Sequence, residues 1–325
     1  MRSKLLSYGR VALGLLLSFG FGFFVIRGLD WGQVVDQLAG VSIGMLSLAV
    51  GVFLFASYLR AVRWRILFVN ESISSARLFI IQNEGIGLNN VVPIRVASEI
   101  IQLAVLSLRD GVNRATALAT LGMERVIDVV ASTMILALAF FFVPEMENFT
   151  VYVWGAFAFT LVVVLLVRLI AWRSEWFSRP RRLKFLGSFA VAVRDLEREP
   201  KRLLASFLVT IVYWLLVGVT AWIIAVALDV PMSPVSATLV IMGTIFFATA
   251  VPAAPSAIGT FEWAVVYVLA FFGIERAAGF GYAVIIHAVF FLPPTIIAMV
   301  FLPREGLMSL RRKQPEVVAS SDDAS

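Results

Sequence analysis

The residues most able to do chemistry are ionisable side chains that lie within or beside long apolar runs. An ionisable group at bilayer depth costs about 3 kcal/mol and seldom persists without a partner. Glu124 and Asp128 are four residues apart, which places both carboxylates on one helical face, with Arg125 turned away from them. The full set is Glu84, Arg95, Glu99, Glu124, Arg125, Asp128, Glu262 and His287.

Two interpretations of these side chains are open. In one, Arg95 or Arg125 holds a phosphate group through charge-assisted hydrogen bonds, while a carboxylate pairs with an amine or exchanges a proton. In the other, the charges form buried ion pairs that fix two parts of the molecule together. For His287, a hydrogen bond between helices is the more common role of an isolated histidine, and a proton relay is the alternative.

A break in an apolar region is the second feature with chemical potential. Residues 251–263 read VPAAPSAIGTFEW and separate two apolar runs that are each too short to cross a bilayer comfortably. A helix that restarts after a break has unpaired N–H groups, which favour an anion together with the helix dipole. We therefore predict a phosphate site at Ser256, Gly259 and Thr260, and we include Glu262 among the substrate-binding residues as a carboxylate that pairs with an amine or exchanges a proton. The alternative is that these small residues only permit tight helix packing.

Composition identifies the class of protein. The 325 residues are 60% hydrophobic and 15% charged, with a mean hydropathy of +0.93, which predicts an all-α, polytopic integral membrane protein. The chain has no cysteine and one histidine, so we expect no metal and no other cofactor. Its formal net charge is +6, but the basic residues cluster at helix ends and in one loop, so no nucleic-acid partner is expected.

Six apolar runs are long enough to span a membrane. They cover residues 11–26, 43–58 with a continuation to 68, 115–143, 152–172, 203–228 and 279–302. Two further regions, 78–108 and 235–272, are interrupted by proline-containing segments. Each forms either a re-entrant pair of half-helices or a hairpin of two thin crossings. The expected architecture is about six spanning helices plus two broken pairs.

The distribution of basic residues sets the expected orientation. Residues 173–202 hold nine basic side chains against four acidic ones. By the positive-inside rule, this segment and both termini are cytoplasmic, in an inner or plasma membrane. The segment acts as a solvated loop that sets topology, or it contacts anionic lipid headgroups.

The two broken regions belong to an internal repeat. A shift of 163 residues places Glu99 on Glu262 and Glu124 on His287. Each unit contains a spanning helix, a broken pair, a short charged loop and a long helix. We expect inverted repeats, as in transporters whose discontinuous helices form the substrate site. The expected divisions are a first transmembrane helix and outer loop (1–42), repeat A (43–143), a linking helix and basic loop (144–202), repeat B (203–303) and a disordered tail (304–325).

Four motifs together resemble a known family. They are RAVRW, NNVVPIR with a following glutamate, MERVIDVV and PAAPSAIGTFE. Their combination is similar to the lysylphosphatidylglycerol synthase transmembrane-region family, whose membrane part is also called the flippase-like domain. The family's first motif has glutamate where this chain has Ser98, with Glu99 one residue later. Fused members carry a soluble aminoacyl-transferase domain after the membrane part, and this chain ends without one, so the resemblance implies lipid translocation or accessory work on lipid-linked glycans.

The sequence thus predicts a translocase that moves a phospholipid or lipid-linked phosphate between leaflets and is not an enzyme. The expected partners are membrane lipids with anionic phosphate headgroups. The alternative is a membrane scaffold or lipid-binding partner for a separate lipid or glycan synthase. An intramembrane transferase ranks third, because no nucleophile and base stand at motif spacing and no glycine-rich phosphate loop is present.

Overall fold

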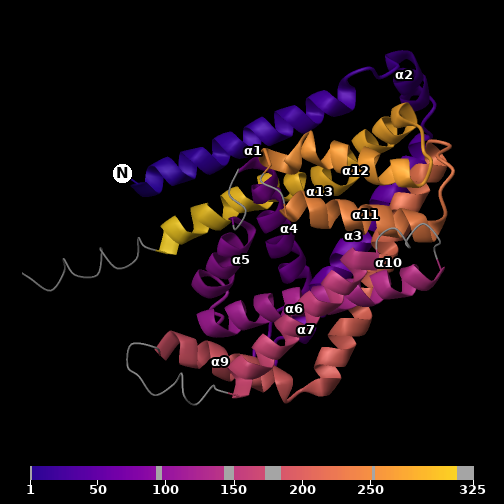
Figure 1. The fold of residues 1–325 in the computed structure, drawn as a ribbon. Helices are drawn as coiled ribbons and strands as arrows, with labels where there is room; N and C mark the ends of the chain where they lie inside the picture. Colours follow the sequence, from indigo (N-terminus) through magenta and orange to yellow (C-terminus); the bar gives the residue numbers. More distant parts are fainter. Residues whose placement is uncertain (1, 93–96, 143–149, 173–183, 251–252, 313–325) are drawn as a thin grey trace, which may run out of the picture.

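The computed structural model describes residues 2–92, 97–142, 150–172, 184–250 and 253–312, and all the regular secondary structure of these residues is helical. Figure 1 shows the helices in chain order. They are α1 (Arg2–Ile26), α2 (Trp31–Ala39), α3 (Ile43–Ile66), α4 (Ser75–Val91), α5 (Ala97–Leu108), α6 (Arg114–Phe142), α7 (Thr150–Trp172), α9 (Lys184–Glu197), α10 (Pro200–Ala227), α11 (Pro234–Ala250), the 3-10 helix η3 (Pro255–Ala257), α12 (Thr260–Phe271) and α13 (Arg276–Arg312).

Each of the six runs expected to span the membrane corresponds, in its described part, to one long helix: α1, α3, α6, α7, α10 or α13. Within the described ranges, α3, α7, α10 and α13 are long and apolar enough to cross a membrane. The apolar part of α1 and the short helix α2 meet at 90° and together form a fifth candidate span. The fold is that of a polytopic helical membrane protein, while six crossings stay a prediction.

Both predicted helix breaks are present. In the first broken region, α4 ends at Val91 and α5 starts at Ala97. In the second, α11 ends at Ala250 and α12 starts at Thr260, with η3 between them. The pairs match in length, because α4 and α11 each have 17 residues and α5 and α12 each have 12. The two helices of each pair pack against each other.

Local sequence sets several helix starts. The side chains of Ser42 and Ser74 accept hydrogen bonds from backbone N–H groups in the first turns of α3 and α4, which satisfies donors that have no partner within the helix. Pro200 is the first residue of α10, where its lack of an N–H group removes no hydrogen bond. Asp30 caps α2 in the same way as the serines cap their helices.

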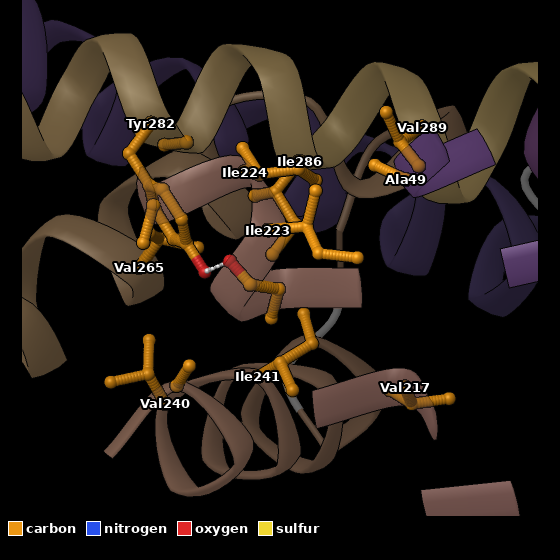
Figure 2. Close-up of a cluster of buried hydrophobic side chains, with 14 of the residues drawn as sticks. Ala49, Val217, Ile223, Ile224, Val240, Ile241, Val265, Tyr282, Ile286 and Val289 are labelled. Carbon is orange, nitrogen blue, oxygen red and sulfur yellow. Dashed lines mark hydrogen bonds between the residues drawn. The ribbon is translucent and has the colours of Figure 1, made fainter. Parts of the chain in front are cut away.

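The first helices of the two expected repeats, α3 and α10, pack against each other along the centre of the molecule. Around this pair, α4 packs along α13, and α1 lies along α12 at the edge (Figure 1). Figure 2 shows the largest buried cluster, in which the Tyr282 hydroxyl donates to the carbonyl of Ala221 among Ile and Val side chains. Lipid tails are as apolar as these side chains, so close packing rather than escape from water holds the helices together.

Three segments are more ordered than the sequence predicted. The expected outer loop before residue 42 contains α2, and Gln37 Nε2 on this helix donates to the carbonyl of Leu228. The basic segment 173–202 contains α9, whose Val193 and Leu196 are buried against α6 and α7. The helix α13 continues past residue 303 to Arg312. In each case tertiary contacts stabilise a helix that charge alone gave no reason to expect.

Candidate functional site

The most buried group of charges lies where α3, α6 and α10 meet. Arg63, with 1% of its side chain exposed, donates to Glu124 Oε1 at 2.7 Å and to Asp128 Oδ1 at 2.5 Å. It also donates to the Thr210 hydroxyl at 3.1 Å. Arg60 donates to Glu124 Oε1 at 3.2 Å. We call Arg60, Arg63, Glu124 and Asp128 the arginine network.

The arginine network contains two positive and two negative side chains, so its charges balance within the protein. This balance allows ionised groups to persist away from water. Thr210 comes from α10 and the four charged residues from α3 and α6, so the network joins the two expected repeats. Glu124 and Asp128 therefore form the buried ion pairs of the second sequence interpretation, and their predicted role in substrate binding stays a prediction.

Arg63 was not among the predicted site residues. The motif RAVRW places Arg60 and Arg63 three residues apart, which puts both side chains on one face of a helix. The apolar pattern weakens after residue 58, so the sequence alone shows them as basic residues near a helix end and names no partner for them. The signal that could have identified their partners is the spacing of Glu124 and Asp128, which places two carboxylates on the same face of α6.

A second ion pair joins α5 and α6. Arg125 Nη2 donates to Glu99 Oε1 at 2.7 Å, and 54% and 38% of these side chains are exposed. As predicted, Arg125 points away from the carboxylates of the arginine network. Arg95, the other predicted phosphate ligand, lies outside the described residues. Arg125 is therefore an accessible cation beside the first helix break, with a carboxylate as its immediate neighbour.

A third pair joins α12 and α13. His287 Nδ1 lies 2.5 Å from Glu262 Oε1, and both side chains are mostly buried. The other carboxylate oxygen of Glu262 accepts the backbone N–H of Gly259 at 2.6 Å, which caps the start of α12. The rings of Phe261 and Phe291 lie against the imidazole. His287 thus makes the interhelical hydrogen bond that the sequence favoured over a proton relay.

The loop before α12 has an unusual backbone and packs on α1. Ser256, Ala257 and Gly259 have φ angles of 56°, 55° and 82°, a region that favours glycine. A Cβ atom on Gly259 would lie 2.3 Å from the carbonyl oxygen of Ser18 on α1. The Ser18 hydroxyl is 3.0 Å from that of Thr260 and accepts the N–H of residue 254 at 2.7 Å. In this conformation Gly259 and Thr260 contact α1, as the tight-packing interpretation expects.

The two broken regions touch each other. The Ser256 hydroxyl donates to the backbone carbonyl of Asn90 at 2.7 Å, which joins η3 to the last turn of α4. The Asn90 side chain donates to the Phe291 carbonyl and to the Thr295 hydroxyl of α13. Asn89 accepts the N–H of Ser98 and so caps the start of α5. Hydrogen bonds therefore connect both breaks and the helix that carries His287.

A hollow on the surface lies between the end of α7 and α9. Its volume is about 580 Å³, and it is lined by Leu165, Arg168, Leu169, Trp172, Arg194, Glu197 and Arg198. Three guanidinium groups and one carboxylate give the lining a positive balance beside three apolar side chains. Burial raises the pKa of Glu197 above its usual value, and the positive charge of Arg168 partly opposes this shift.

The long apolar helices point to a multi-pass membrane protein, and the paired charges within its helices form the candidate site. Comparison with families gives a more specific assignment, because the model for the lysylphosphatidylglycerol synthase TM region matches residues 11–298. The chain belongs to this family, as the motifs indicated. No curated protein and no solved structure matches the chain.

Proposed function

We propose that this protein moves a phospholipid or lipid-linked phosphate between the leaflets of a membrane. The proposed path runs through the place where the two broken-helix pairs meet, and the protein acts without a catalytic domain. The family supports a lipid-related membrane function, since the matched model describes the membrane region of lipid-modifying synthases. In the proposed orientation both termini are cytoplasmic, as the basic residues of 173–202 suggest.

The observation that carries the proposal is the contact between the two breaks. The hydrogen bond from Ser256 to Asn90 places both interruptions at one position in the bundle. Interrupted helices have backbone groups that hydrocarbon cannot satisfy, so they are tolerated where protein, water or a ligand supplies partners. Meeting breaks of this kind are typical of transporters, whose ligand sites lie between repeats.

Matching contacts support the repeat relation. In the first unit, Glu99 in the first turn of α5 pairs with Arg125 of α6. In the second unit, Glu262 in the first turn of α12 pairs with His287 of α13. Glu99 and Glu262 are the residues that the 163-residue shift superposes, and their partners differ by one position. We propose that the units are inverted repeats, each closed by a carboxylate between its broken pair and its long helix.

The proposed substrate contacts follow from accessibility. Among the predicted cations that the structure describes, Arg125 has the most exposed side chain, so we assign it to binding the phosphate. Glu262 and His287 pair with each other in this conformation. Their proposed contacts with the substrate form in an open state, in which α12 and α13 separate. Ser256, Gly259 and Thr260 would then present backbone N–H groups to the headgroup once α1 has moved from the loop.

Leaflet exchange tests the proposal directly. The purified protein is reconstituted in liposomes with fluorescent phospholipids of several headgroups, and exchange is compared for wild type, Arg125→Ala and Glu262→Gln. Both variants are expected to slow exchange at least about tenfold, the effect of losing one charge-assisted contact of about 1.4 kcal/mol or more. Glu275→Gln and Arg276→Ala, at the exposed start of α13, are matched controls that keep the wild-type rate.

A scaffold or lipid-binding partner of a separate synthase is the second candidate function. The observation in its favour is α7, because only 6% of the window Val153–Ile170 is buried inside the described fold. Its surface includes the exposed side chains of Trp154, Phe159 and Leu161, which lipid or a partner helix can cover. Exchange no faster than in empty liposomes, for every headgroup tried, would reject translocation and favour the scaffold.

A further inference from the structure

One buried acidic residue has no role in the contacts described so far. Glu84 lies in the middle of α4 and is fully buried, and neither of its carboxyl oxygens has a hydrogen-bond partner among the described residues. Its neighbours differ, because Gln82 donates to Glu124, Asn83 donates to Ser57, and Asn90 donates to α13. Glu84 is therefore the buried polar side chain of α4 for which no hydrogen bond is found among the described residues, whereas the three buried amides each donate at least one.

The charges nearest to Glu84 balance one another without it. Arg77, two helical turns before Glu84 on the same face of α4, pairs with Asp110 at 3.1 Å and with Glu305 of α13 at 2.6 Å. Arg109, just after α5, also pairs with Glu305. Two arginines thus meet two carboxylates. We call these four residues the end cluster, and an ionised Glu84 would add a negative charge that the cluster does not compensate.

The other helices packed on α4 make no ion pair with Glu84 within the described ranges. Arg65, near the end of α3, donates to the carbonyl of Ile73, and Arg304 of α13 lies over the ring of Phe301. On α3, Arg60 and Arg63 pair with Glu124 and Asp128, as described above. On α13, the imidazole of His287 is paired with Glu262. Facing α4 across Gly85, α5 presents the neutral side chains of Ser98 and Gln102.

An unpaired carboxylate in such surroundings costs far more than an unpaired carboxylic acid. The acid lacks hydrogen bonds, whereas the anion also loses its hydration without gaining a countercharge. We propose that Glu84 is a reversible proton-binding site, which holds a proton in the conformation described here and releases it to water when the end cluster opens.

The end cluster provides both the exit and the countercharge. Its side chains are partly exposed, with 21% of Arg77 and 30% of Arg109 accessible, so it connects buried α4 to the surface. Glu305 is two residues after Pro303, one of three prolines within α13, and proline is where helices bend. If Glu305 moves away, Arg77 and Arg109 lose one carboxylate and attract the Glu84 anion in its place. The proton then leaves the carboxyl oxygen for water.

The proposed proton site follows from the structure alone, whereas the role of this proton as the coupling ion rests on the proposed function. Coupling would follow because α4 contacts both breaks and α13, so the charge of Glu84 depends on how those elements are arranged. Downhill proton movement would then favour one direction of lipid movement.

Infrared spectroscopy of the reconstituted protein tests the site. Wild type at neutral pH is expected to show the carbonyl stretching band of a protonated carboxyl group, lost at alkaline pH and absent from Glu84→Gln. Glu84→Asp keeps a carboxyl group and should show the band at a frequency shifted from that of wild type. This variant keeps the site testable if Glu84→Gln folds poorly. Glu99→Gln is the matched control, because that carboxylate is ion-paired, and it should leave the band unchanged.

Absence of any Glu84-dependent band at neutral pH would overturn the proposal, and so would a band that disappears on addition of sodium at constant pH. In a second experiment, a pH gradient imposed on the liposomes should accelerate lipid exchange by wild type and leave Glu84→Gln unaffected. A band without exchange would reject the proposed translocation and keep the proton site. Lipid exchange without a Glu84-dependent band would reject the proton site and keep the proposed translocation.

Discussion

Replacement of Arg63 by leucine should destabilise the protein strongly. Both carboxylate oxygens of Asp128 accept hydrogen bonds from Arg63, so the substitution leaves this carboxylate without a cation partner among the described residues. Glu124 keeps Arg60. Removal of one partner from a buried ion pair typically costs about 3–5 kcal/mol. At about 2 °C per kcal/mol for a large chain, the unfolding midpoint should fall by about 6–10 °C.

The assay is thermal unfolding in detergent at a fixed heating rate, followed by tryptophan fluorescence. Arg65→Leu is the matched control, since it removes an exposed arginine from the same helix and should shift the midpoint by about 2 °C or less. A double variant, Arg63→Leu with Asp128→Asn, removes the orphaned charge and should recover about half of the loss. If Arg63→Leu behaves like the control, or the double variant is no better than the single one, the arginine network is not stabilised by charge balance.

Three further predictions concern other parts of the chain. Gly259→Ala should lower stability by about 1–3 kcal/mol, because its φ is 82° and the new methyl group would meet a carbonyl oxygen of α1, whereas Gly22→Ala, with ordinary contacts, should have little effect. Because burial raises the pKa of Glu197, mild acidification should neutralise this side chain before an ordinary glutamate and make the hollow between α7 and α9 more positive. The amount of anionic lipid that stays bound during purification should therefore increase as the pH falls. The Glu197→Gln variant should show no such pH dependence. Cysteines introduced at Ser188 and Glu147 test orientation in intact cells, where labelling from outside is expected at position 147 only and the opposite pattern would reverse the topology.

Periodicity and interruptions were the parts of the fold that the sequence revealed best. The break after Val91 and the break before Thr260 were predictable because proline and glycine interrupt otherwise apolar runs, and no tertiary contact is needed to see this. The extra helices α2 and α9 were not predicted. They are short, and their order depends on contacts with distant helices that a local pattern does not contain.

The partners of the site residues were harder to predict than the residues themselves. The sequence singled out Glu124, Asp128 and Glu262 as charges that need partners. It did not assign Arg63 to the carboxylates, because the two helices are about 60 residues apart in the chain and their relative rotation is set by packing. It also gave no sign that α1 covers the loop before α12, a contact between residues 18 and 260 that depends on how α1 docks.

The close approach of α4 and α13 has a mechanical consequence. A Cβ atom on Gly87 would lie 2.5 Å from the Cβ of Ala298 and from the carbonyl oxygen of Pro294, so the two helices touch through their backbones there. Surfaces in such contact resist sliding, because no flexible side chain lies between them to adjust. Around Gly87 the two helices should therefore move together, so a displacement of the part of α13 before Pro303 is transmitted directly to α4.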